Sequence, residues 1–230
     1  MIFVTGDTHR MLDVKKLDIE NFPEQRLLSR KDYLIITGDF GGVWTGNEKD
    51  DRVLDFHENK NYTTLFIGGN HENYDALYAY PVEEWMGGKI HRIREHVIHL
   101  MNGQVFDIDG KKFFVMGGAT SADRALRQSG ITWWPQEEPS AAEYKEALEN
   151  LSKTDFKVDV ILSHTCPESV RRNMLKIYKG FIDYESGVEK FLDRVLLDTE
   201  YSCWFTGHIH IDREFPDQKM RILYNSVVKL

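Results

Sequence analysis

Short apolar runs recur along the chain, and five of them end abruptly in a cluster of small and polar residues. The runs do not alternate apolar with polar positions, which is typical of strands buried on both faces. The five runs, each with the cluster that follows it, are Ile2–Thr5 with Gly6-Asp7-Thr8-His9, Tyr33–Thr37 with Gly38-Asp39, Thr64–Ile67 with Gly68-Gly69-Asn70-His71, Val158–Leu162 with Ser163-His164, and Cys203–Thr206 with Gly207-His208-Ile209-His210. The pattern predicts five buried strands with polar loops at their carboxyl ends.

Segments with helical spacing of apolar residues separate several of these strands. They are Asp50–Asn59, Asn73–Ala79, Ser140–Leu151, Glu168–Tyr178 and Glu185–Asp198. Strands that alternate with helices are typical of an α/β fold with parallel strand pairs.

The middle of the chain has a different pattern, with four apolar runs joined by short turns and no helix between them. The runs are Ile90–Arg94, Val97–Leu100, Gln104–Ile108 and Lys112–Met116, and the last turn contains Asp109-Gly110. This arrangement predicts an antiparallel meander. Because no repeat and no linker rich in Pro, Gly or Ser divides the chain, we expect a single domain over residues 1–230.

Composition narrows the class of protein. The 230 residues are 41% hydrophobic and 12% aromatic, as in folded globular proteins, and the formal net charge is −8. A negative chain is poorly suited to holding a long nucleic acid by phosphate neutralisation. No run approaches the roughly 18 apolar residues of a membrane span. Because the first strand leads directly into a polar cluster, we expect no signal peptide. Since Cys166 and Cys203 make no disulfide framework, we expect a soluble cytoplasmic protein without a membrane partner.

The polar clusters contain a set of candidate metal ligands. They are Asp7, His9, Asp39, Asn70, His164, His208 and His210. Sites in open α/β sheets are built at the carboxyl ends of strands, where these residues lie. Carboxylate, imidazole and amide groups together suit Mn²⁺, Fe or Zn²⁺. The set is too large for one four-coordinate ion and fits two ions, which about 3.5–4 Å apart clamp the attacking and leaving oxygens of a displacement at phosphorus.

In order and spacing, five short blocks resemble the calcineurin-like metallophosphoesterases. The blocks are Gly6-Asp7-Thr8-His9, Gly38-Asp39, Gly69-Asn70-His71-Glu72, Ser163-His164 and Gly207-His208-Ile209-His210, so the resemblance spans positions 6 to 210. It implies a four-layer α-β-β-α sandwich of two mixed sheets and a hydrolase with a dinuclear metal centre.

The resemblance also implies a role for each ligand. Asp7, His9 and His210 would hold one ion, Asp39 would bridge both, and Asn70, His164 and His208 would hold the second. The cofactor would be two divalent ions, most simply Mn²⁺, with Fe or Zn²⁺ as alternatives. A hydroxide activated by these ions would attack the phosphorus of a phosphomonoester or phosphodiester, with His71 and Asp39 as catalytic residues. The expected substrate is a phosphorylated small molecule or a nucleotide.

One block departs from the pattern of the family. Many members continue the second block as Gly-Asp-x-x-Asp-Arg, but here Gly42 and Val43 stand in place of the Asp and Arg. In the protein phosphatases of the family, that Asp orients the substrate-facing histidine and that Arg grips phosphate. The departure argues against a Ser/Thr protein phosphatase and leaves His71 without its usual orienting residue, for which Glu72 is a candidate substitute.

The segment 121–140 is a candidate substrate-side flap, because it follows a predicted strand and lies between the metal blocks. Arg124 is our candidate phosphate contact. The adjacent Trp133 and Trp134 would wall a pocket or stack on a base or an aromatic leaving group. Alternatively, the tryptophans pack on the sheet and the arginines pair with nearby glutamates.

Two other functions are compatible with the sequence. A binding scaffold would keep the fold without catalysis, as some relatives of the family do, and a nuclease would act on short nucleic acid. Histidines outside the blocks, His57, His91, His96 and His99, are expected to be structural, since none follows a glycine at a strand end.

Overall fold

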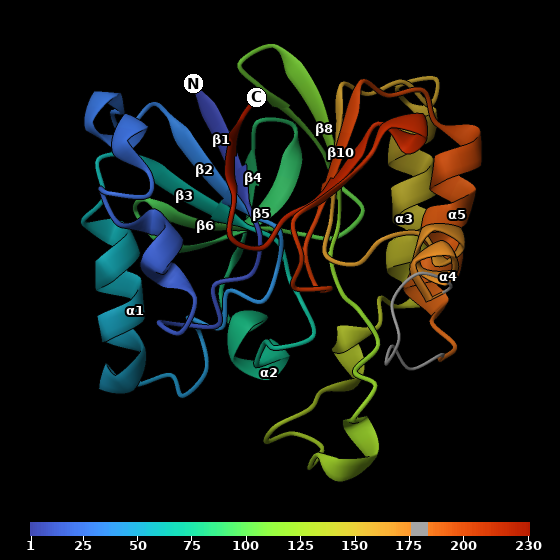
Figure 1. Cartoon of the computed structure of the whole chain (residues 1–230). Helices are drawn as coiled ribbons and strands as arrows, with labels where there is room; N and C mark the ends of the chain where they lie inside the picture. Colours follow the sequence, from blue (N-terminus) through green and yellow to red (C-terminus); the bar gives the residue numbers. More distant parts are fainter. Residues whose placement is uncertain (176–183) are drawn as a thin grey trace.

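Two mixed β-sheets packed face to face form the centre of the molecule, and helices cover their outer faces (Figure 1). The structure is a computed structural model that describes residues 1–175 and 184–230. The arrangement of helices, two sheets and helices confirms the expected α/β sandwich.

The first sheet has the strand order β13-β1-β2-β3-β6-β5-β4. Its strands are β1 (Ile2–Thr5), β2 (Tyr33–Ile36), β3 (Thr63–Phe66), β4 (Val82–Trp85), β5 (Gly88–Arg94), β6 (Val97–Leu100) and β13 (Val227–Lys229). β1, β2, β3 and β6 run parallel, while the pairings β13–β1, β6–β5 and β5–β4 are antiparallel. Helix α1 (Glu48–Glu58) contacts β3 and β6, and the one-turn helix α2 (Tyr74–Leu77) follows β3 in the chain.

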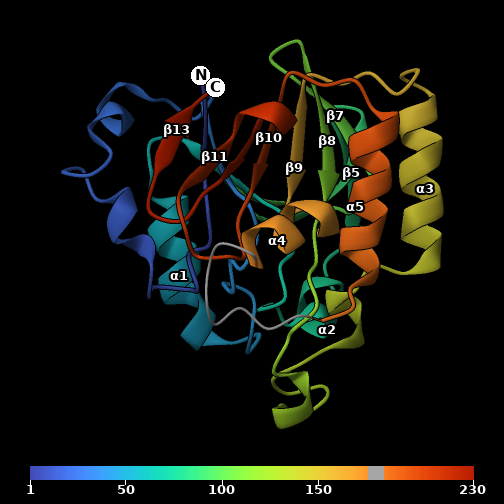
Figure 2. The same ribbon diagram turned by 45° about the vertical axis from the view of Figure 1, so that its right-hand side comes forward.

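The second sheet has the strand order β11-β12-β10-β9-β8-β7. Its strands are β7 (Val105–Ile108), β8 (Lys111–Met116), β9 (Val160–Ser163), β10 (Cys203–Thr206), β11 (Arg213–Phe215) and β12 (Met220–Ile222). The four inner strands are parallel, and β7 and β11 at the two edges are antiparallel to their neighbours. Helices α3 (Ala141–Ser152), α4 (Glu168–Leu175) and α5 (Gly187–Asp198) lie on its outer side (Figure 2).

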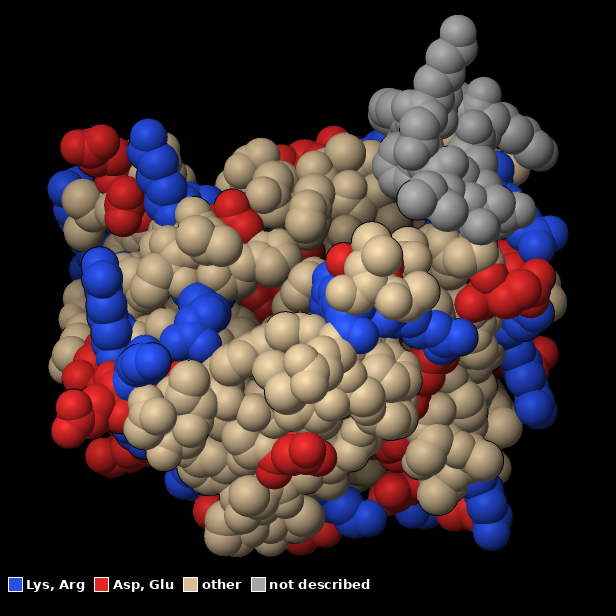
Figure 3. Space-filling view, turned by 90° about the horizontal axis from the view of Figure 1, so that it is seen from below, with Lys and Arg blue, Asp and Glu red and all other residues tan. Residues whose placement is uncertain are grey.

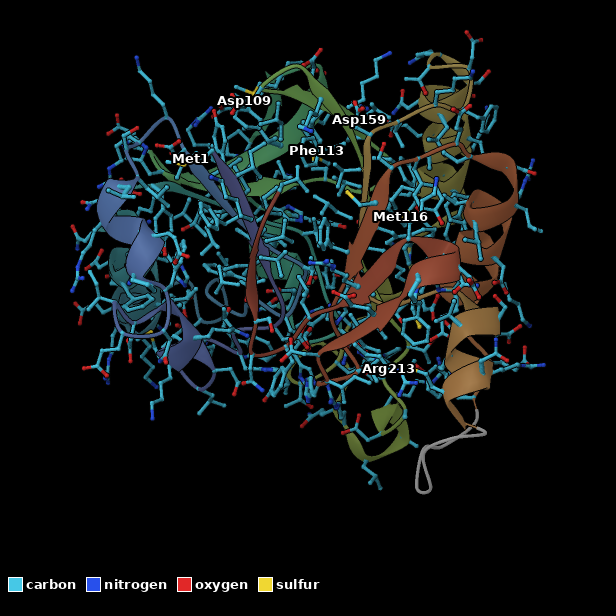
Figure 4. All side chains as sticks on the ribbon, turned by 45° about the horizontal axis from the view of Figure 1, so that its top comes forward. Met1, Asp109, Phe113, Met116, Asp159 and Arg213 are labelled. Carbon is cyan, nitrogen blue, oxygen red and sulfur yellow. The ribbon has the colours of Figure 1, made fainter. Side chains whose placement is uncertain are left out.

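Burial on both faces explains why the strand runs show no alternation. Along β8, Phe113 and Val115 point into the core between the two sheets, whereas Phe114 and Met116 point into the core beneath the helices. All four side chains are fully buried. Figure 4 labels Phe113 and Met116 on this strand. Both positions of the two-residue repeat must therefore be apolar.

The helices agree with the predicted segments apart from their ends. Local capping fixes these ends: the Ser140 hydroxyl accepts the Glu143 amide N–H at the start of α3, and the Asn47 side chain accepts the Lys49 amide N–H at the start of α1. The segment predicted as Glu168–Tyr178 begins at Glu168, and its last residues lie outside the described residues.

The expectation of one antiparallel meander is wrong. β5 and β6 form a hairpin in the first sheet, whereas β7 and β8 form a hairpin in the second. Between them the chain crosses from sheet to sheet, and buried polar side chains satisfy the backbone there: Asn102 Oδ1 accepts the N–H of Gly117 at 2.8 Å, and Gln104 Oε1 accepts that of Lys89 at 3.3 Å. Strands β4, β11, β12 and β13 were not predicted.

Acid sensitivity of the fold is expected at His57. Its ring packs between Phe40 and Phe56, with centroids 5.0 Å away in both cases, and the side chain is fully buried. Burial, helped by the nearby charge of Lys60, lowers the pKa of His57 to about 3. In the unfolded chain His57 binds a proton below about pH 6.5, whereas in the folded protein it stays neutral down to about pH 3. The free energy of unfolding therefore falls as the pH drops from 6.5 toward 3.

We therefore expect His57→Leu to lose about 1–2 kcal/mol less free energy of unfolding than the wild type between pH 7 and pH 5. Urea denaturation at pH 7, 6 and 5 measures the difference. Equal losses in the two proteins would contradict the assignment.

Candidate metal centre

The five polar clusters converge where the carboxyl ends of the parallel strands meet, at the lower end of the sandwich in Figure 1. β1, β2 and β3 are neighbours in the first sheet, and β9 and β10 are neighbours in the second. The loops of both sheets therefore face one space. Asp39 after β2 and His164 after β9 connect the two sheets directly, with 3.3 Å between Asp39 Oδ1 and His164 Nε2.

One group of donors gathers around Asp7. His210 Nε2 lies 3.0 Å from Asp7 Oδ2, and His9 Nε2 lies 3.2 Å from Asp39 Oδ2. One donor atom from each of these four residues lies within 4.8 Å of every other. Asp7 and Asp39 are buried, whereas His210 is exposed at the rim. Two buried carboxylates and two imidazoles within this distance fit a divalent cation.

A second group of donors lies on the other side of Asp39. His164 Nε2 is 3.1 Å from Asn70 Oδ1, and the ring of His208 packs edge-on against that of His164 with centroids 5.0 Å apart. Asp39 directs Oδ2 to His9 and Oδ1 to His164. The structure thus brings all seven candidate ligands together, with Asp39 between the two groups.

Hydrogen bonds to the far ring nitrogens orient two of the histidines. His164 Nδ1 donates to the carbonyl oxygen of Thr37 at 2.8 Å, and His9 Nδ1 donates to Asp13 Oδ2 at 2.7 Å. Each ring thereby directs Nε2 at the carboxylates, as metal-binding histidines do when a carbonyl or carboxylate holds the other nitrogen.

Sequence analysis missed a part of this shell that comes from the end of the chain. Asp13 also accepts the hydroxyl of Tyr224 at 3.0 Å, and the Tyr224 ring stacks on His210 with centroids 4.7 Å apart. A single tyrosine therefore contacts one candidate ligand directly and another through Asp13. The partners are 211 residues apart, so no local pattern could have identified them.

The loops that carry the donors have strained backbones. His9, Asp39, His208 and His210 all have φ in the left-handed region, between 43° and 65°. Such conformations cost about 1–3 kcal/mol each outside glycine and cluster at functional sites. The strained residues lie where the chain leaves a strand and turns a donor side chain toward the space between the sheets.

The two buried carboxylates dominate the electrostatics of the cluster. Burial alone lowers the pKa of His164, but the charge and hydrogen bond of Asp39 outweigh it and raise that pKa to about 9. The same balance raises the pKa of His9 to about 9. Burial raises the pKa of Asp39, yet His164 outweighs it and holds the value well below the usual range. The two carboxylates therefore stabilise positive charge in the cluster, and a divalent ion would supply such charge.

His71 lies beside the cluster with its ring toward the flap. Its backbone N–H donates to Asp39 Oδ1 at 2.7 Å, which fixes its position relative to the candidate ligands. The two terminal nitrogens of Arg127 lie 3.4 Å from Nδ1 and 3.2 Å from Nε2 of the ring. Sequence analysis did not single out Arg127 as a neighbour of His71.

Glu72 does not orient His71. Its carboxylate accepts the backbone N–H groups of Phe40 at 2.8 Å and Gly41 at 3.0 Å, and burial raises its pKa to about 8. Glu72 therefore holds the loop that follows Asp39. The prediction that Glu72 replaces the missing aspartate in orienting His71 is therefore wrong.

The segment 121–140 combines structural and exposed parts. Trp134 is buried, donates its indole N–H to Asp75 at 3.0 Å and packs edge-on against Trp44. Of the two roles predicted for the tryptophans, Trp134 therefore has the structural one. Arg124 is exposed, and its guanidinium lies 6.0 Å from the centre of the Trp133 ring. Arg124 and Trp133 line a hollow of about 170 Å³, and so does Ser121, which contacts the candidate ligand Asn70.

One hydrogen-bond chain joins this segment to the candidate ligands. Asn70 Nδ2 donates to Ser121 Oγ at 3.2 Å, and the Ser121 hydroxyl donates to the carboxylate of Glu137. Glu137 is 1% exposed, and burial raises its pKa to about 7. Because the Asn70 amide nitrogen is held by Ser121, its oxygen is directed at His164.

Gly38 tests how closely the two sheets must approach. A Cβ atom there would lie 2.1 Å from His164 Nδ1, and its φ of +101° is unfavourable for other residues. We expect Gly38→Ala to lower the free energy of unfolding by at least about 2 kcal/mol through overpacking and strain. Chemical denaturation measures this, with Gly46→Ala as a matched control, since Gly46 also has positive φ but nothing within 4 Å of its Cβ position. Equal destabilisation of the two variants would show that backbone strain alone acts.

Comparison with known proteins identifies the family of the chain. The model of the calcineurin-like phosphoesterases matches residues 1–212. A lariat debranching enzyme of Drosophila pseudoobscura pseudoobscura is 27% identical over 160 residues, which cover 64% of this chain but only 28% of that enzyme. The crystal structure of the phosphopantetheinyl hydrolase PptH from Mycobacterium tuberculosis aligns over 96% of this chain and 86% of its own, at 16% identity and a TM-score of 0.40. In the described part of the chain, no helix is long and apolar enough to cross a membrane. The chain belongs to the calcineurin-like phosphoesterase family.

Proposed function

We propose that this chain is a metal-dependent hydrolase of phosphoesters. The residues that would hold its two divalent ions are Asp7, His9, Asp39, Asn70, His164, His208 and His210. The observation that supports this most strongly is the position of Asp39, whose two carboxylate oxygens face two separate groups of donors. This is the arrangement that a ligand shared by two ions requires.

The donor set fits ions that accept both oxygen and nitrogen. Mn²⁺ is our first choice, with Fe or Zn²⁺ as alternatives, because the set contains carboxylates, an amide oxygen and imidazoles but no thiolate. The ions would neutralise charge on the phosphoryl oxygens and lower the pKa of a water molecule toward neutrality.

His71 would be the catalytic side chain of the protein itself, acting together with Asp39. Burial lowers the pKa of His71, so that its ring is neutral at neutral pH and holds one proton. A neutral imidazole can donate that proton in a hydrogen bond to a phosphoryl oxygen or to the leaving group. Its backbone bond to Asp39 keeps it next to the reacting phosphorus.

A phosphorylated small molecule or a nucleotide is the substrate class that we favour. The net charge of −8 argues against a long nucleic acid. A nuclease acting on short nucleic acid is the second candidate, supported by the partial identity to a debranching enzyme. A scaffold without catalysis is disfavoured, because every ligand position is filled and the donors converge.

Asp39→Asn tests the shared ligand. Removing the charge between the two donor groups should reduce turnover by more than the roughly 100-fold that loss of an outer-shell partner costs. Hydrolysis of p-nitrophenyl phosphate and bis-p-nitrophenyl phosphate with added Mn²⁺ measures this. Asp107→Asn, which alters an exposed carboxylate on β7, is the control. Wild-type rates in a metal-loaded Asp39→Asn protein would refute the mechanism.

Metal content and ester preference together test the class of enzyme. We expect about two metal ions per chain by elemental analysis, loss of turnover on treatment with EDTA, and recovery with Mn²⁺. Preference for the diester would favour nucleotides, and preference for the monoester would favour phosphorylated metabolites. Cleavage of a short oligonucleotide would support the nuclease. A folded protein with no metal and no turnover would leave the scaffold.

A further inference from the structure

We propose that Arg127, on the flap, grips the phosphoryl group of the substrate beside His71. The assignment rests on the proposed function and adds a substrate-binding residue to it. From a different part of the chain, Arg127 would take the role of the arginine that is missing from the second block. At that place the chain has Val43, a buried side chain in an apolar cluster that can contact no phosphate.

The first support is the direction of the Arg127 side chain. Residues 122–126 and 128–132 on either side of it are exposed, whereas the Arg127 side chain is only 14% exposed. It is therefore turned inward, from a flap that projects beyond the end of the sandwich (Figure 1). Seen from that end, basic side chains gather at the centre of the face beside a hollow (Figure 3).

The second support is the unused hydrogen-bonding capacity of the guanidinium. Arg127 forms an ion pair with Asp123, with 2.8 Å between Nε and Oδ1, and this contact holds the side chain along the flap. The two terminal nitrogens then face Nδ1 and Nε2 of His71, at 3.4 and 3.2 Å. An imidazole ring offers at most one acceptor nitrogen, so it cannot satisfy both. Two oxygens of a phosphoryl group can, because the guanidinium fork matches their spacing.

The third support is the way in which the flap is anchored. At one end Ser121 is bonded to Asn70 and Glu137, and at the other end Trp134 is buried and bonded to Asp75. Both ends are thus tied to elements that carry the site. Arg127 is held near its working position before substrate binds, which reduces the entropy lost on binding.

Arg124, our candidate phosphate contact from sequence, lies in a different part of the flap. It is exposed and faces the Trp133 ring rather than His71. Its contact with phosphate stays a prediction, and the two arginines can be separated by experiment.

The test compares Arg127→Ala, Arg127→Lys and Arg124→Ala in protein loaded with Mn²⁺. Binding of inorganic phosphate is measured by titration calorimetry, and KM and kcat with the preferred p-nitrophenyl ester. For Arg127→Ala we expect phosphate affinity to fall roughly 10- to 100-fold and KM to rise by a similar factor, as for loss of a charge-assisted hydrogen bond. Arg127→Lys should recover only part of this, because lysine restores the charge without the fork. Metal content should not change.

Two controls separate the proposed contact from other effects. Leu126→Ala alters the adjacent flap residue, whose side chain is 91% exposed, and Arg26→Ala removes a distant exposed positive charge. Both should bind phosphate as the wild type does. Unchanged phosphate affinity in Arg127→Ala would overturn the assignment, and so would a loss of kcat alone, which would indicate that Arg127 only positions His71.

The outcomes also distinguish this assignment from the proposed function. Phosphate binding that depends on Arg127, in a wild-type protein that hydrolyses no ester, would refute the hydrolase and leave the contact. Turnover that is insensitive to Arg127 would refute the contact and leave the hydrolase. A metal-loaded wild type that neither binds phosphate nor turns over an ester would refute both.

Discussion

Two carboxylates without contact to bulk water, Asp7 and Asp39, lie where the loops of the two sheets meet, and the site is arranged around the charge that they carry. Charge buried in this way must be compensated by nearby cations or by hydrogen bonds. Histidines from both sheets supply part of the compensation, and backbone amides supply more: His208 N–H donates to Asp7, and His71 N–H to Asp39. The same requirement favours a cation over a neutral ligand at this position.

The two ends of the sandwich are held together by different contacts. The loops at the site have left-handed residues and close approaches between backbone and side chains. At the opposite end, the amino group of Met1 pairs with Asp32, directly before β2 of the first sheet, at 2.5 Å. The same amino group lies 3.7 Å from Asp109 on the β7–β8 hairpin of the second sheet (Figure 4). Between the two ends lies a continuous apolar core from both sheets. Packing in this core thus compensates for the free-energy cost of the strained loops at the site.

The strands that carry the site were predictable because burial on both faces leaves an unbroken apolar run, and the polar cluster marks its end. The crossing between the sheets was not, since a hairpin has the same turn signals whichever sheet it joins. β4 and β11 were not predicted because they are short and partly exposed, so their sequences contain no buried apolar run. Arg124 and Arg127 are three residues apart and equivalent by pattern. The 3-10 turn ends at Leu126 and Arg127 has an extended backbone, and the two side chains contact different partners, Trp133 and His71. Tyr224 and Asp13 meet through the fold alone.

The anchoring of the flap has an evolutionary consequence. Ser121 and Trp134 fasten it to the rest of the protein, while the residues between them are largely exposed and contribute little to the core. If the flap contacts the substrate as proposed, substitutions in the stretch 122–133 would change which molecules bind without altering the candidate metal ligands. Substrate recognition and metal binding would then lie in parts of the chain that can diverge at different rates.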